Sequence, residues 1–283
     1  MRLVNTYLAQ NPCYAANMRG ADDRYTIFQR RGPQGFVLHS VGCAQPSAET
    51  FARRWNASSC QVCVHAFIDA ETQVVHQTLP WNFRGWHCGG SANNTHVGVE
   101  MCEPKWLQYK GKMDRFTVPT EHLEQARAQV CRSYAAAVEL VAYLAGIYGW
   151  DVTKPGVILS HAEAGKRGLA SGHSDPEHLW TQLGLPYTMD TFRRDVAEAL
   201  GVTAQPDCAK EDIDMETLRR GSSGKQVQVL QALLNLWGGY KLSADGAFGG
   251  MTFAAVKDFQ RRHGLTADGV VGPKTWGKLL ATR

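Results

Sequence analysis

Alternating apolar and polar positions predict several short strands in the first 200 residues. The patterns occur at residues 35–39, 61–68, 72–79, 96–102 and 157–160. Residues 61–68 and 96–102 alternate with a period of two, which is typical of strands that present different residue types on their two faces. The segment 72–79 follows a short polar turn and is predicted to pair with 61–68 as a hairpin.

A helical period marks three further segments, at residues 47–55, 120–148 and 190–200. The longest carries apolar residues at three- and four-residue spacing, which predicts a helix with one face in the core. Thr120 is expected to cap its first turn. Residues 1–34 show no clear period and are predicted to be irregular. Strands that alternate with helices predict an α/β fold, with a mixed central sheet flanked by helices.

The pattern changes near residue 200 and predicts a second, smaller domain. Residues 201–215 show no period and are predicted to be a linker, which leaves a first domain of 1–200 and a second of 216–283. An internal repeat in the second domain consists of Asp245, Gly246, Gly249 and Thr252, followed by Asp268, Gly269, Gly272 and Thr275. Each copy predicts a turn and a helix start, so we expect a small three-helix domain with Phe259 and Trp276 in its core.

The composition is typical of a soluble globular protein. The 283 residues are 44% hydrophobic and 20% charged, which is sufficient for a substantial core. The net charge is +4, and basic residues cluster only in pairs, such as Arg30 with Arg31. This distribution mildly favours a polyanionic surface but is too weak to indicate a nucleic-acid partner.

Targeting and redox signals are sparse. The first residues contain no apolar core of signal-peptide length, and no later run approaches the ~18 apolar residues of a membrane helix. We therefore expect a chain made in the cytoplasm, without membrane insertion, whose eight cysteines are free thiols. Cys60 and Cys63 form a CxxC, but a spacing of three along a strand points them to opposite faces, which disfavours a metal or redox site.

Two histidines stand at the ends of predicted buried strands. His39 ends the first of these strands, and His161 directly follows the last, while Asp175 lies on the glycine-rich loop beyond it. Two imidazoles and one carboxylate would leave a tetrahedral zinc one open position for water, which is the arrangement of catalytic zinc sites. Each histidine taken alone is more simply interpreted as an ordinary core or surface residue.

A glutamate interrupts an otherwise apolar strand pattern. Glu100 lies on the face opposite to Val97, Val99 and Met101. A buried carboxylate costs free energy unless it has a partner or a function. The alternative is that Glu100 lies on the exposed face of an edge strand.

Two other zinc signatures are excluded. His161, Ala162 and Glu163 match the HxE that opens the site of zinc deaminases, but the PCxxC that completes such a site is missing. The HExxH of metalloprotease helices is also absent from the sequence.

Five motifs, in family order, resemble the zinc-dependent N-acetylmuramoyl-L-alanine amidases of the type 2 class, which are related in fold to peptidoglycan recognition proteins. They are VLHS, VCVHAFID, RGWHCGG, HVGVEM and LSHAEAGKRGLASGHSDP. The segment from Gly221 to Leu279 resembles a peptidoglycan-binding module, with the pattern LQ..L, DG.FG..T, FQ and DG.VG..TW. The resemblance therefore implies a zinc amidase joined to a wall-binding domain.

The resemblance also implies roles for single residues. It makes His39, His161 and Asp175 the zinc ligands, in agreement with the reasoning above, and it makes Glu100 the general base. His173 occupies a position that is often lysine in the family, and an imidazole that donates a hydrogen bond there would stabilise the developing oxyanion. The residues expected to line the substrate groove are His65, Trp86 and His87.

The implied reaction is cleavage of the amide between the lactyl group of N-acetylmuramic acid and L-alanine, with peptidoglycan as partner and Zn²⁺ as cofactor. Two alternatives stay open: a recognition protein that binds wall fragments without cutting them, and an amidase that acts on soluble muropeptides. Without a signal peptide, the two-domain layout suggests a phage or prophage lysin that leaves the cytoplasm through a separately made pore. A wall enzyme whose leader is not part of the given sequence would show the same layout. The sequence makes no prediction about the oligomeric state.

Overall fold

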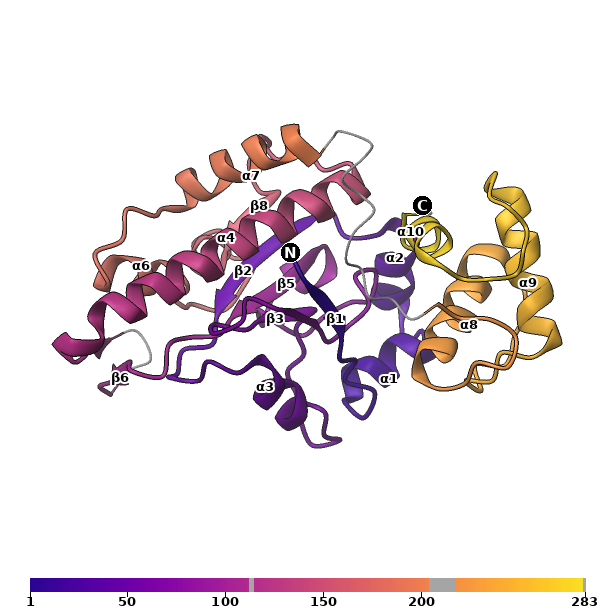
Figure 1. Cartoon of the computed structure of the whole chain (residues 1–283), viewed down its shortest axis with the longest axis horizontal. Helices are drawn as coiled ribbons and strands as arrows, with labels where there is room; N and C mark the ends of the chain where they lie inside the picture. Colours follow the sequence, from indigo (N-terminus) through magenta and orange to yellow (C-terminus); the bar gives the residue numbers. More distant parts are fainter. Residues whose placement is uncertain (112–114, 204–216, 282–283) are drawn as a thin grey trace.

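A six-stranded sheet forms the centre of the first part of the chain (Figure 1). The structure is a computed structural model that describes residues 1–111, 115–203 and 217–281. The strands are β1 Leu3–Asn5, β2 Gly35–Ser40, β3 Ala66–Ile68, β4 Val75–Gln77, β5 His96–Met101 and β8 Ile158–Ser160. Their order is β1-β4-β3-β5-β2-β8, and only β3 and β4 are antiparallel. This arrangement confirms the predicted mixed sheet and the predicted hairpin.

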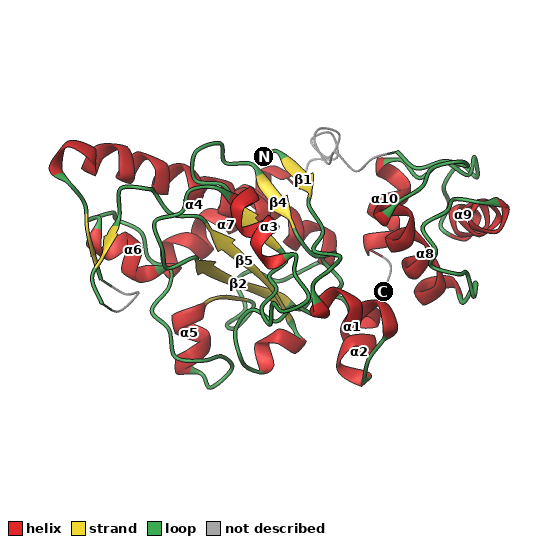
Figure 2. Ribbon diagram, turned by 90° about the horizontal axis from the view of Figure 1, so that it is seen from below, coloured by secondary structure: helices red, strands yellow, loops and turns green. Residues whose placement is uncertain are grey.

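Helices cover both faces of this sheet. They are α1 Pro12–Arg19, α2 Asp23–Arg31, α3 Ala48–Trp55, α4 Leu123–Tyr148, α5 His161–Lys166, α6 Glu177–Gln182 and α7 Met189–Thr203, with short 3₁₀ turns η1 at Ser91–Asn94 and η2 at Thr120–His122. Helices α4 and α7 lie on one face and α3 on the other (Figure 1). A two-stranded hairpin of β6 Gln108–Tyr109 and β7 Phe116–Thr117 lies beside α6 in both views (Figures 1 and 2).

Helix α4 is the main core helix. Together with η2 it is long and apolar enough to cross a membrane by length and composition, but 61% of its most apolar window is buried inside the protein. It packs against the sheet and α7, which confirms the prediction of a core stripe. The α-helix itself begins at Leu123, and Thr120 is the first residue of the 3₁₀ turn that precedes it. The prediction that Thr120 caps the helix is therefore wrong.

The prediction that residues 1–34 are irregular is also wrong. This segment contains β1, α1 and α2. The side chain of Asn11 accepts a hydrogen bond from the Cys13 N–H at the start of α1, and Pro12 occupies the first helical position. Asp22 caps α2 in the same way. These capping residues are visible in the sequence, but helices of eight and nine residues are too short to give a clear period.

The C-terminal region folds into the three predicted helices, α8 Lys225–Gly238, α9 Gly250–Arg262 and α10 Pro273–Ala281 (Figure 2). Phe259 and Trp276 are buried in its core, as predicted. The predicted linker falls mostly on residues 204–216, which lie outside the described residues, and residues 201–203 belong to α7. Helix α8 lies beside α2, where Phe83 and Leu233 line one small cavity.

Two buried glutamines explain the internal repeat. The Gln231 amide donates to Asp245 Oδ1, the Ala247 carbonyl and Thr252 Oγ1, and its oxygen accepts from the Gly246 N–H. Gln260 makes the equivalent four bonds to Asp268, Val270, Thr275 and Gly269. The repeated aspartates, glycines and threonines therefore hold each turn to the preceding helix. The shared role is structural, since these polar atoms are directed at a buried amide.

Candidate metal centre and substrate groove

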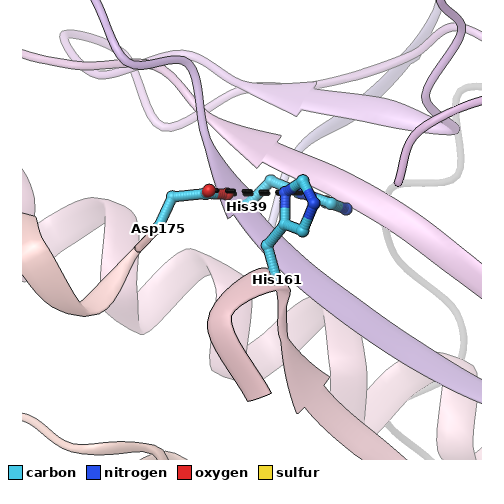
Figure 3. Close-up of side chains that lie close together, drawn as sticks. All are labelled: His39, His161 and Asp175. Carbon is cyan, nitrogen blue, oxygen red and sulfur yellow. Dashed lines mark hydrogen bonds and ion pairs between the residues drawn. The ribbon is translucent and has the colours of Figure 1, made fainter. Parts of the chain in front are cut away.

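The sheet brings the predicted metal ligands to one edge. Strands β2 and β8 are parallel neighbours, so His39 near the end of β2 and His161 just after β8 lie at the same end of the sheet. Ser160 and Glu163 form a capping box that starts α5 at His161. Asp175 stands on the loop before α6, and its carboxylate points at both imidazoles (Figure 3).

The three side chains are spaced like ligands of one ion. The Nδ1 atoms of His39 and His161 lie 3.0 Å apart, and the Asp175 oxygens lie 3.4 Å and 3.3 Å from them, respectively. A tetrahedral zinc with bonds of about 2.0–2.1 Å separates its ligand atoms by about 3.3–3.4 Å. All three residues are buried, and they are the one such group of histidine, cysteine and carboxylate ligands found within the described residues. The donor set therefore fits zinc.

His87 fixes the tautomer of His39. The Nε2 atom of His87 lies 3.1 Å from the His96 carbonyl, which only accepts, so this nitrogen carries the proton. The Nδ1 of neutral His87 is then an acceptor, and it lies 3.0 Å from His39 Nε2. His39 must therefore carry its proton on Nε2, which leaves the Nδ1 lone pair facing His161 and Asp175.

Ser171 has the same effect on His161. The serine hydroxyl donates to the Cys88 carbonyl at 3.2 Å, and its oxygen lies 3.2 Å from His161 Nε2. That nitrogen is therefore the donor, and His161 Nδ1 is left with its lone pair toward the proposed ion. Both imidazoles thus present the same nitrogen to one point, each held by a hydrogen bond on its far side.

The charge states of the ligands suit a divalent cation. Burial lowers the pKa of His39 and of His87, which keeps both rings neutral. Burial alone would raise the pKa of Asp175, but the His161 and His39 imidazoles beside its carboxylate hold that pKa well below the usual range. Neutral imidazoles beside an ionised carboxylate are the protonation states that metal binding requires.

Glu100 faces the same cavity from a central strand. It is the register partner of His39 on β5, which lies between β3 and β2, so the edge-strand alternative is wrong. Its Oε2 is buried and has no hydrogen-bond partner among the described residues. Burial raises the pKa of Glu100 well above the usual range, and the nearby Asp175 and Glu103 raise it further. An unpartnered buried carboxylate oxygen in a cavity marks a group that meets a ligand or water.

Glu100, His161 and Asp175 line a groove with a volume of about 850 Å³. Trp86 and His87 line it, as predicted, and the Trp86 indole N–H donates to the Tyr25 hydroxyl at 3.0 Å. His173 lines the groove and is exposed. The ring of His173 is tilted by 31° to that of His161, with their centroids 4.3 Å apart, and its Nδ1 lies 3.1 Å from Ser171 Oγ. The groove thus combines the candidate ligands, a carboxylate and an imidazole that reaches solvent.

His65 does not line this groove, which corrects the prediction. Its side chain is fully buried, and its Nε2 donates to the Phe83 carbonyl at 2.7 Å. Its Nδ1 accepts from the Gly98 N–H at 3.0 Å. Burial lowers the pKa of His65 to about 4. The imidazole is a neutral structural link between β5 and the loop that follows β4.

Several groove residues were missed at the level of sequence. Trp55 is the last residue of α3, and its half-buried indole lines the groove. Ser171 and Lys166 also line the groove, but no sequence motif or periodicity marks either of them as a functional residue. Glu103, just beyond β5, is buried and accepts hydrogen bonds from the Gly42 N–H and the Tyr109 hydroxyl, and burial raises its pKa to about 7.

The cysteines follow the prediction. The seven cysteines within the described residues are free. Cys63 is fully buried, whereas the Cys60 thiol contacts the Val62 carbonyl at 3.4 Å, and neither belongs to a group of candidate metal ligands. Among the residues that the structure describes, the CxxC is therefore part of the packing.

The fold and the site together define an α/β domain with a candidate His-His-Asp metal centre at the end of its sheet. The family model of N-acetylmuramoyl-L-alanine amidases matches residues 29–178, which are 150 of the 283 residues. The chain belongs to this family. A model of a peptidoglycan binding domain matches residues 223–279.

Individual proteins resemble different parts of the chain. N-acetylmuramoyl-L-alanine amidase CwlL from Bacillus licheniformis is 26% identical over 88% of this chain and 66% of its own length. The zinc D-Ala-D-Ala carboxypeptidase of Streptomyces albus G is 46% identical over 22% of this chain and 26% of its own length. The crystal structure of the Staphylococcus aureus hydrolase AmiA with its ligand has a TM-score of 0.45 and 17% identity, and covers 62% of this chain and 76% of that one. The chain thus covers less than two thirds of the length of the amidase CwlL, at 66%, and of the carboxypeptidase, at 26%.

Proposed function

We propose that this protein hydrolyses the amide between N-acetylmuramic acid and L-alanine in peptidoglycan, with zinc as its cofactor. One observation carries the proposal: the Nδ1 atoms of His39 and His161 and the Asp175 carboxylate converge on one point. Glu100, with its unpartnered buried oxygen, lines the same groove as His161 and Asp175. Membership of the amidase family supplies the reaction class.

Zinc, when held by these three residues, supplies Lewis acidity and lowers the pKa of a bound water toward ~7. His39, His161 and Asp175 hold the ion, while His87 and Ser171 keep the two imidazoles in the tautomer that binds it. These five residues do not take part in proton transfer. Their contribution is to orient the site.

Glu100 is the proposed proton carrier. Its carboxylate takes a proton from the attacking water and returns that proton to the nitrogen of L-alanine as the carbon–nitrogen bond breaks. The products are a lactyl carboxylate on the sugar and a free peptide amine. His173, which lines the groove and is exposed, is placed to donate a hydrogen bond to the carbonyl oxygen as negative charge develops there.

The C-terminal helices are the proposed anchor on the wall. The match to a peptidoglycan binding domain covers α8 to α10. Attachment raises the local concentration of the catalytic groove on a polymer, whereas it gives no advantage on a small soluble muropeptide. We therefore infer a catalytic domain that ends with α7 and a wall-binding domain that begins near residue 217.

Digestion of purified walls tests the proposal. Mass spectrometry of wall digested by the zinc-loaded protein should show released stem peptides with free L-alanine amines and glycan strands with intact disaccharides. Binding without release would instead identify a recognition protein. Cleavage of soluble muropeptides with intact walls left untouched would indicate a recycling amidase.

A further inference from the structure

A second cavity continues from the groove over the metal ligands. It has a volume of about 910 Å³ and lies between α5, α6 and the β6–β7 hairpin. The residues that line both cavities are Ala162, Lys166, His173, Ser174 and His178. A substrate that crosses the candidate metal centre therefore has a continuous path into this second cavity.

The second cavity is cationic. Lys110, Arg115 and Lys166 line it, and all three are exposed. None of them forms an ion pair with another described residue. The carboxylate among its described lining residues is Glu177, which accepts a hydrogen bond from Ser160 Oγ at 2.6 Å. Among the described residues, three cations without an ion pair and one half-buried carboxylate line this cavity, which gives this part of the described lining a positive charge.

The part of the groove that is not shared with the second cavity has a different character. Trp55, Val62 and Trp86 line it together with the uncharged amide of Gln61. Two half-buried indoles provide flat apolar surfaces, and amides provide hydrogen bonds without charge. Such a surface suits the faces and hydroxyls of a sugar better than it suits an ion. The groove that holds His161 and Asp175 thus has an aromatic part and also continues into a cationic cavity.

We propose that Lys110, Arg115 and Lys166 form a subsite for the carboxylates of an acidic stem peptide, with the glycan in the part of the groove lined by Trp55 and Trp86. This inference rests on the proposed function, because it assigns the leaving peptide to one side of the scissile amide. The cations attract carboxylates through charge, so affinity for the peptide should fall as ionic strength rises.

Binding of two matched ligands tests the subsite. Calorimetric titration would use a muramyl peptide with free carboxylates and the same peptide with those carboxylates converted to primary amides. Exposed ion pairs are individually weak, but the three cations contribute together, so the free acid should bind about tenfold more tightly than the amide. The triple variant K110Q/R115Q/K166Q should lose this preference and still bind the amide as the unchanged protein does.

Lys154→Gln is the matched control, since Lys154 is an exposed cation outside both cavities. The control should keep the tenfold preference. Equal binding of acid and amide by the unchanged protein, or a preference that survives the triple variant, would overturn the subsite. Discrimination of the two ligands without any cleavage would support the subsite while rejecting the amidase reaction, so the two failures can be told apart.

Discussion

His39 and His87 are joined by a hydrogen bond of 3.0 Å between Nε2 and Nδ1, and the His96 carbonyl fixes its direction. Removing the acceptor frees His39 to adopt the other tautomer, in which Nδ1 carries a proton. His87→Ala should therefore weaken zinc binding about 10- to 100-fold. Competition titration against a chelator of known affinity measures this change.

His87→Gln should recover part of this loss, because its side-chain oxygen can accept the same hydrogen bond. His76→Ala is the matched control, since His76 lies on β4 and does not line the groove. Zinc affinity of His87→Ala within twofold of the control would show that His87 does not position the ligand.

Glu100→Gln should abolish proton transfer and leave the site otherwise intact. The amide is nearly the same size but cannot accept the proton of water, so kcat should fall about 10²- to 10⁴-fold. Zinc content and wall binding should not change. Glu121→Gln, which alters an exposed carboxylate, serves as the control. Turnover of Glu100→Gln near that of the control would remove Glu100 from the mechanism.

His65 should make the folded protein sensitive to acid. Its pKa is lowered from 6.5 to about 4, so the unfolded chain takes up the proton first as the pH falls. Protonated Nδ1 can no longer accept from the Gly98 N–H. The stability due to neutral His65 is complete above pH 6.5 and is lost toward pH 4, by about 3 kcal/mol.

Urea unfolding with a chelator present, at pH 7 and pH 4.5, measures this loss. The free energy of unfolding of His65→Gln should vary less steeply with pH than that of the unchanged protein. The difference in slope should correspond to at most one proton taken up on unfolding. Identical slopes for the two proteins would contradict the assignment of a lowered pKa to His65.

Gln231→Ala should loosen the C-terminal helices. The substitution leaves the Gly246 N–H and the Asp245, Ala247 and Thr252 oxygens without their buried partner. We expect a loss of at least about 2 kcal/mol in local stability. Hydrogen exchange in α8 and α9 should accelerate about 30-fold, since 1.4 kcal/mol is a factor of ten. Lys225 is exposed, and Lys225→Ala is the control, in which amides of α8 and α9 should exchange as in the unchanged protein. Equal exchange rates in the two variants would show that Gln231 does not hold the repeat.

The sequence could identify the chemistry of the centre because the ligand types themselves carry it. His39, His161 and Asp175 stand at strand ends or on a loop, where buried apolar runs stop, and the periods of those runs are readable. The sequence did not predict that β2 and β8 are neighbours in the sheet, because strand pairing depends on packing between segments far apart in the chain.

Burial by loops accounts for most of what sequence reasoning missed. In the alternating segment 61–68, His65 lies on the face opposite to the valines. The loop that contains Phe83 covers this face, and the Phe83 carbonyl accepts the hydrogen bond from His65 Nε2. Ser171 and Trp55 gain their positions from the same kind of tertiary packing. Side chains that are polar and unpatterned in sequence become part of the site only when a distant backbone meets them.

X-ray absorption at the zinc edge tests the central claim most directly, because it reports the ligands of the ion itself. The account predicts one zinc per chain, with two imidazole nitrogens at about 2.0–2.1 Å, oxygen ligands at about 2.0–2.2 Å and no sulfur. His161→Ala should remove one imidazole from this shell. A sulfur ligand at about 2.3 Å, or a chain that retains no zinc after dialysis, would contradict the account.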